Sequence, residues 1–112
     1  MRLFSREEKD LISGVWTNGF DLHGLIDIND LTMSIWEAIA KVPYPITTTF
    51  NLLGNSSIVN VLNESNEVVL RLHIDKPKIE FKILKPKMTR DDSVAAAFAT
   101  MATMGVIDKM CN

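Results

Sequence analysis

Four short segments between residues 46 and 84 alternate apolar and polar residues and are separated by turn-forming residues. Alternation with a period of two is typical of strands that bury one face of a sheet. The separating residues are Gly54-Asn55 and the stretches 63–66 and 75–78. Because each connection is short enough for a hairpin, this region predicts a four-stranded antiparallel β-meander.

The strand register follows from the sequence, because apolar residues must share one face of the sheet. A turn at Gly54-Asn55 sets the parity, and the other two turns preserve it and add Val68 to the inner face. A slip of one residue in any hairpin would move apolar side chains to the polar face. The predicted opposed pairs are Thr48–Val61, Phe50–Val59, Leu70–Ile83, Leu72–Phe81 and Ile74–Ile79 on the inner face, with Thr49–Asn60 and Asn51–Ile58 on the outer face.

Two helices are expected before this sheet. Ser5 and Glu8 have the spacing of a capping box, which predicts a helix over residues 6–17. Asn29 is placed to cap a second helix, which must end at Pro43 because proline cannot donate a helical hydrogen bond.

A third helix is expected after the sheet, over residues 90–110, where Thr89 and Asp92 repeat the capping pattern. Residues 20–27 fit either a loop or a short strand. The predicted fold class is therefore α+β: two N-terminal helices, a four-stranded antiparallel β-meander and a long C-terminal helix, packed on one sheet face.

Composition sets the general class of the protein. A length of 112 residues suits a single domain over residues 1–112. The single cysteine suits a reducing cytoplasm. The chain contains no apolar run of about 20 residues, the length that spans a bilayer, and its N-terminus lacks the pattern of a signal peptide. We expect a soluble cytoplasmic protein without a membrane partner.

The predicted register places His73 opposite Glu80 on the outer face of the sheet. A carboxylate beside an imidazole raises its pKa and can form an acid–base couple. An exposed cross-strand pair that contributes little to stability explains the same two residues more simply. We favour this second interpretation and predict no catalytic residue.

His23 lies in a stretch, residues 21–30, that is rich in aspartate, a composition compatible with a divalent cation. The spacing fails the calcium-loop pattern, because Leu31 would fill a ligand position and Thr32 the glycine position. Cys111 has no neighbouring base in the sequence that could activate it. We therefore predict neither a metal site nor a cofactor.

Charge is distributed unevenly along the chain, although the net charge is only −2. Residues 71–90 contain seven basic and two acidic residues, whereas residues 1–70 contain four basic and nine acidic ones. Lysines commonly protect edge strands, which explains the basic segment without a ligand. The predicted outer sheet face has no aromatic residue for base stacking, so we do not expect nucleic-acid binding.

The last predicted helix is apolar on more than one side. Met104 and Ile107 lie well around its circumference from Phe98. Such a helix is either buried centrally or covered in part by another chain, so a homodimer through this helix remains an open alternative.

The function that we predict is a non-catalytic protein-binding module. Small acidic proteins without catalytic motifs suit inhibitor or immunity roles, in which charge-complementary docking neutralises a basic protein partner. The alternatives are a small-ligand-binding or catalytic domain that uses the polar sheet face, and a homo-oligomeric structural module. The candidate partner-binding residues are Glu7, Glu8, Asp10, Asp21, Asp27, Asp30 and Glu37.

Overall fold

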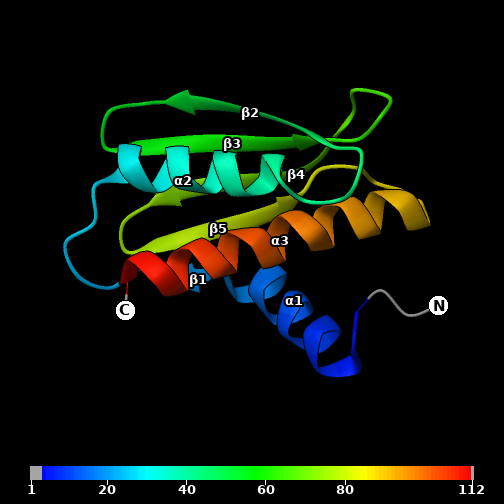
Figure 1. Cartoon of the computed structure of the whole chain (residues 1–112), viewed down its shortest axis with the longest axis horizontal. Helices are drawn as coiled ribbons and strands as arrows, with labels where there is room; N and C mark the ends of the chain where they lie inside the picture. Colours follow the sequence, from blue (N-terminus) through cyan, green and yellow to red (C-terminus); the bar gives the residue numbers. More distant parts are fainter. Residues whose placement is uncertain (1–3, 112) are drawn as a thin grey trace.

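Five antiparallel strands form one sheet in the order β1-β5-β4-β3-β2 (Figure 1). The computed structural model describes residues 4–111, except for the side chain of Cys111, so the expectation for that thiol lies outside the described residues. The strands are β1 (Phe20–Asp21), β2 (Thr47–Leu52), β3 (Ser56–Leu62), β4 (Val68–Asp75) and β5 (Lys78–Ile83).

The β2–β3 and β4–β5 hairpins have the register that the sequence predicts. Each of the seven predicted pairs lies in register, including Phe50 opposite Val59 and Leu72 opposite Phe81. The inner-face residues of the two middle strands and of the start of β5 are buried completely. The α+β class is therefore confirmed, and the core lies on one side of the sheet.

The number of strands is five, not four. Residues 20 and 21 form β1, in which Phe20 pairs with Ile79 and Asp21 with Lys78. Gly19 brings the chain onto β5 with a φ of 75°, a conformation that glycine adopts without strain. A strand of two residues is too short for its alternation to be visible in the sequence.

The inner face of β4 departs from the prediction at its start. The pairing between β3 and β4 shifts at Val61/Leu62, because Leu62 pairs with Val68 while Val61 pairs with Leu70. Val69 is the extra residue of this bulge and is buried completely, whereas Val68 is half-buried. The inner position predicted for Val68 is therefore taken largely by Val69, because a bulge resets side-chain parity.

The three helices begin with side-chain caps. They are α1 (Arg6–Asn18), α2 (Ile28–Ala40) and α3 (Arg90–Cys111). The predicted capping box of α1 is present, with the Ser5 amide 2.8 Å from Glu8 Oε1. Asp27, not Asn29, caps α2, and its Oδ1 accepts a hydrogen bond from the Asn29 amide at 2.8 Å. This earlier start adds Ile28 to the buried stripe of the helix.

Helices α2 and α3 lie side by side on the inner face of the sheet, and α1 packs against β5 and α3 (Figure 1). The Trp16 indole N–H donates to Thr100 Oγ1 at 2.8 Å and joins α1 to α3. Met104 and Ile107 are both buried within this chain. The apolar circumference of α3 is therefore accounted for by its central position, while a homodimer through α3 stays a prediction.

The close approach at Gly19 can be tested by substitution. A Cβ at this position would lie 2.6 Å from the Ile79 carbonyl oxygen. We expect Gly19→Ala to lower the free energy of unfolding by about 1–3 kcal/mol, measured by urea titration. Gly105→Ala is the matched control, because a Cβ there meets no atom within 4 Å and should stabilise α3 by about 0.5–1 kcal/mol. Equal stability of the two variants would contradict the role of Gly19.

Candidate functional site

The outer face of the sheet is polar and carries no covering helix (Figure 1). His73 lies opposite Glu80, as predicted, and both side chains are exposed. The Arg71 Nε donates to the Asn60 side-chain oxygen at 2.8 Å on the same face. The predicted juxtaposition of His73 and Glu80 is confirmed, whereas its use in catalysis stays a hypothesis.

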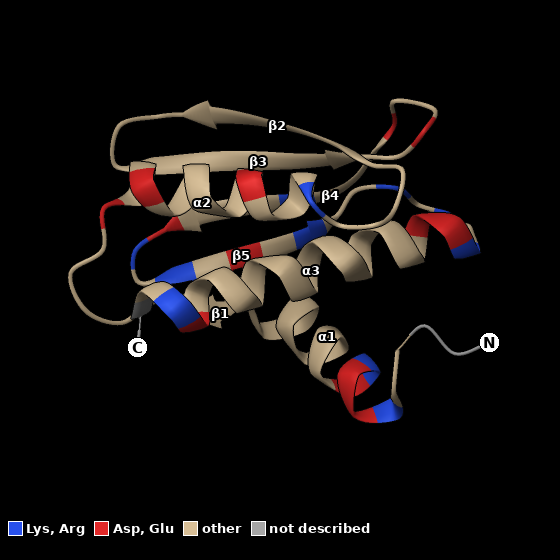
Figure 2. Ribbon diagram, viewed as in Figure 1, with Lys and Arg blue, Asp and Glu red and all other residues tan. Residues whose placement is uncertain are grey.

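The structure separates the seven predicted partner-binding carboxylates into three places (Figure 2). Three lie on the first turns of α1, where Arg6 and Lys9 intervene, and Glu8 is engaged in the capping box. One lies on β1 opposite Lys78. The remaining three lie at or on α2, with only Lys41 near its end. These three groups are Glu7, Glu8 and Asp10; Asp21; and Asp27, Asp30 and Glu37.

Exposed apolar side chains gather at one end of the molecule. The described residues include five large apolar side chains that are exposed, and only Leu11 lies away from this end. The β1–α2 loop, the β2–β3 hairpin and the last turn of α3 all reach the left end in Figure 1. We call this surface the apolar end and define it by Leu25, Leu52, Leu53 and Met110.

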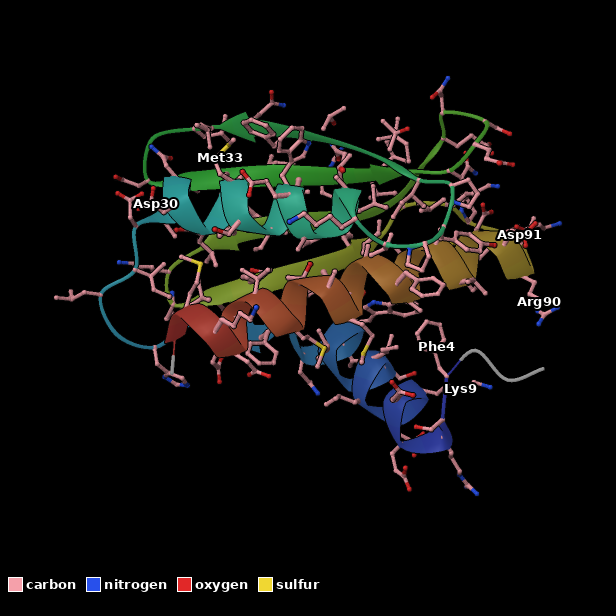
Figure 3. All side chains as sticks on the ribbon, in the orientation of Figure 1. Phe4, Lys9, Asp30, Met33, Arg90 and Asp91 are labelled. Atoms are coloured by element: carbon pink, nitrogen blue, oxygen red, sulfur yellow. The ribbon has the colours of Figure 1, made fainter. Side chains whose placement is uncertain are left out.

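A shallow hollow of about 400 Å³ lies at the apolar end. The start of α2 lines it on one side, and the β2–β3 and β4–β5 turns line it on the other. Asp27 and Asp75 contribute carboxylates, and Lys76 contributes an amine. Asp30 and Met33 lie close to this end on α2, whereas Lys9 lies at the far end of the molecule (Figure 3). The apolar end therefore adjoins the acidic start of α2.

Sequence reasoning missed an ionic cluster at the opposite end, in which Asp92 is buried and Glu67 is exposed. The Lys85 amine lies 2.6 Å from Asp92 Oδ2 and 3.1 Å from Glu67 Oε1. The Asn63 amide donates to Asp92 Oδ1 at 2.8 Å. We call Lys85, Asp92, Glu67 and Asn63 the lysine cluster; it joins the β3–β4 turn, the end of β5 and the start of α3.

Asp92 has two roles in the lysine cluster. It completes the predicted capping box with Thr89, whose amide donates to Asp92 Oδ2 at 3.1 Å. It also receives the Lys85 and Asn63 hydrogen bonds, which lower the pKa of its carboxyl far below the ordinary 3.8. The same contacts raise the pKa of Lys85, chiefly through the hydrogen bond to Asp92. The capping spacing was visible in the sequence, whereas the distant partner Lys85 was not.

The lysine cluster borders a polar hollow of about 230 Å³. Tyr44 lies in its wall and donates to Asp91 Oδ1 at 3.0 Å. Partial burial is the main cause of a raised pKa of Tyr44, and the hydrogen bond to Asp91 is the second cause. Since the carboxylate of Asp92 and the amine of Lys85 already bind each other, these contacts support a structural role for the cluster.

His23 lies in a stretch rich in aspartate, a residue type that can bind divalent cations. Within the described range, residues 4–111, no three His, Cys, Asp or Glu side chains come together in a way that could hold a metal ion. His23 itself is exposed on the β1–α2 loop.

Comparisons with protein-family models, curated proteins and solved structures found no match for this chain. None of the helices that the structure describes has the length and apolar character needed to cross a membrane.

The lysine cluster predicts a specific loss of stability in acid. The folded state lowers the pKa of Asp92, so the stabilisation is present above pH 3.8, the ordinary value, and is lost as the pH falls below it. We expect the free energy of unfolding to fall progressively between about pH 5 and pH 1, mostly below pH 3.8, and to fall less steeply in Asp92→Asn. Urea titrations across this range measure the slope.

The control is Asp108→Asn, which removes an exposed carboxylate from the same helix and should keep the wild-type slope. A slope in Asp92→Asn as steep as that of the wild type would show that the lysine cluster does not determine the acid dependence.

Proposed function

We propose that the chain is a non-catalytic protein-binding module that docks a basic protein partner through its apolar end and the neighbouring carboxylates of α2. The observation that carries this proposal is the gathering of four exposed apolar side chains from three separate segments at one end. Single exposed apolar residues are ordinary, whereas several together are typical of an interaction surface.

Leu25 is the proposed anchor of this contact. Its side chain is fully exposed at the tip of the β1–α2 loop, next to Gly24 with a φ of 79°. Complete burial of a leucine side chain is favourable by about 1.5–3 kcal/mol. A partner with an apolar pocket for Leu25 would therefore gain affinity from a residue that makes no contribution to the core of this chain.

The carboxylates of α2 supply the charge complementarity. Asp30 and Glu37 are seven residues apart, so they lie on one stripe of the helix, and both are exposed. Lys41 is the nearest base along the chain. A basic partner surface would be attracted to this stripe, which accelerates association and makes the binding salt-dependent.

An inhibitor or immunity-type role is the specific form of this proposal. In that role the partner is a basic toxin or enzyme, and docking covers its active surface. The acidic character of the chain and its exposed anchor support this form. The carboxylates of α1 have a smaller part in it, because Arg6 and Lys9 neutralise much of their charge.

The test is capture of the partner from native host extract with immobilised chain. We expect one basic protein to be retained, with loss above about 0.5 M salt as charges are screened. Leu25→Ser and the double change Asp30→Lys with Glu37→Lys should each reduce capture at least tenfold. Both variants alter exposed residues, so circular dichroism should confirm that they remain folded.

The matched control is the double change Glu7→Lys with Asp10→Lys, which changes the net charge by the same amount but on α1. Capture by this control should stay near the wild-type level. Equal capture by all variants, or loss confined to the α1 variant, would rule out the proposed surface.

A further inference from the structure

The two edges of the sheet are protected very differently. At the β5 edge, β1 covers the first two residues, α1 packs alongside, and Lys78 and Lys82 add charge. β2 forms the other edge and contains neither a charged residue nor a proline over its six residues. Natural edge strands normally carry such protection because unpaired backbone groups attract another strand. The β2 edge therefore has no feature of this kind that would prevent another strand from pairing with it. We call it the open edge.

The backbone groups that face outward from β2 can be identified. The Leu53 amide donates to the Ser56 carbonyl at 2.9 Å, so residue 53 points toward β3. Because bonding direction alternates along an antiparallel strand, Phe50 and Leu52 direct their N–H and C=O groups away from β3. The Trp36 indole donates to the Thr48 carbonyl at 3.2 Å, which places Thr48 in the same outward set.

Trp36 also limits the length of the open edge. Its indole occupies the Thr48 carbonyl, and its ring packs edge-on against Phe50 with centroids 5.6 Å apart. One end of β2 is thus covered from α2. The half nearer the hairpin keeps its outward groups, those of Phe50 and Leu52, unoccupied by α2.

We propose that a second copy of this chain pairs with the open half of β2, antiparallel about a two-fold axis at Asn51. In this register Phe50 of each copy lies opposite Leu52 of the other, and their outward N–H and C=O groups form four hydrogen bonds. The paired stretch covers residues 49–53, about 17 Å of strand. The two five-stranded sheets then become one continuous sheet.

The side chains fit the same register. Leu52 and Leu53 are 44% and 56% exposed in the single chain. Pairing about Asn51 places Leu52 against Phe50 of the second copy on the inner face. It places Leu53 against Thr49 of the second copy on the outer face. Both exposed leucines therefore gain apolar or β-branched cross-strand neighbours, the kind of pair that stabilises a sheet.

A second copy suits this edge better than an unrelated strand. In a two-fold dimer both copies pair through the same short segment, residues 49–53. This segment ends before Thr48, so the hydrogen bond from Trp36 to Thr48 is kept in both copies. The edge carries no charge that would repel its own copy. Met33 lies on the β2 side of α2 (Figure 3), so this flank would border the seam. Leu52 and Leu53 also belong to the apolar end. The proposed function is tested through Leu25 and the carboxylates of α2, which lie outside the paired stretch, so the tests of the two proposals can fail separately.

A charge swap at Asn51 tests the pairing. Asn51 is exposed on the outer face and would lie directly opposite itself in the second copy, where like charges oppose pairing. We expect wild-type sedimentation to shift from monomer toward dimer as concentration rises. Asn51→Lys and Asn51→Asp should each stay monomeric, with dissociation constants at least tenfold higher, and an equal mixture of the two should recover the dimer.

Thr47→Lys is the matched control, because it adds the same charge to the same face of β2 outside the paired stretch. It should dimerise like the wild type. In a Cys111→Ser background, Asn51→Cys should form an intermolecular disulfide on oxidation and Thr47→Cys should not, since only the first pair lies within bonding distance.

Three outcomes would overturn the proposal. The first is a monomer at all concentrations up to the millimolar range. The second is a dimer that Asn51→Lys leaves intact, which would favour an interface through α3. The third is failure of the Lys and Asp variants to pair with each other while each alone is monomeric.

Discussion

The register of the antiparallel meander is the constraint on which the rest of the structure depends. It gathers the apolar residues of β3, β4 and β5 on one face, and a slip of one residue would reverse that arrangement. Because only this face is apolar, α2 and α3 both pack there, and the small residues of α3 bring it close to its neighbours. The same register leaves the other face polar and open to solvent.

The two proposed binding surfaces are the apolar end and the β2 edge of the sheet, and neither uses a face of the sheet. The apolar end collects exposed leucines from connections that the core does not use. The β2 edge is open because Trp36 covers only its first part. The lysine cluster has the opposite character, since Lys85 and Asp92 satisfy each other and fasten α3 to the sheet. These contacts stabilise the fold.

Properties of the sequence that repeat locally predicted the structure well. Alternation predicted the pairs of the β2–β3 and β4–β5 hairpins, and the Ser5–Glu8 spacing predicted the start of α1. Features created by contacts between distant segments were missed. The two residues of β1 depend on the approach of Gly19 to β5, and the burial of Val69 depends on a bulge. The apolar end likewise exists only because the β1–α2 loop, the β2–β3 hairpin and the last turn of α3 reach the same end of the molecule.

Amide hydrogen exchange along β2, resolved by residue in dilute protein, tests most directly the claim that one register determines both the core and the open edge. The amides of Asn51 and Leu53 should be protected, because they face β3. The amides of Phe50 and Leu52 should exchange rapidly, because they face outward. Equal protection of all four amides, or the reverse alternation, would contradict the account.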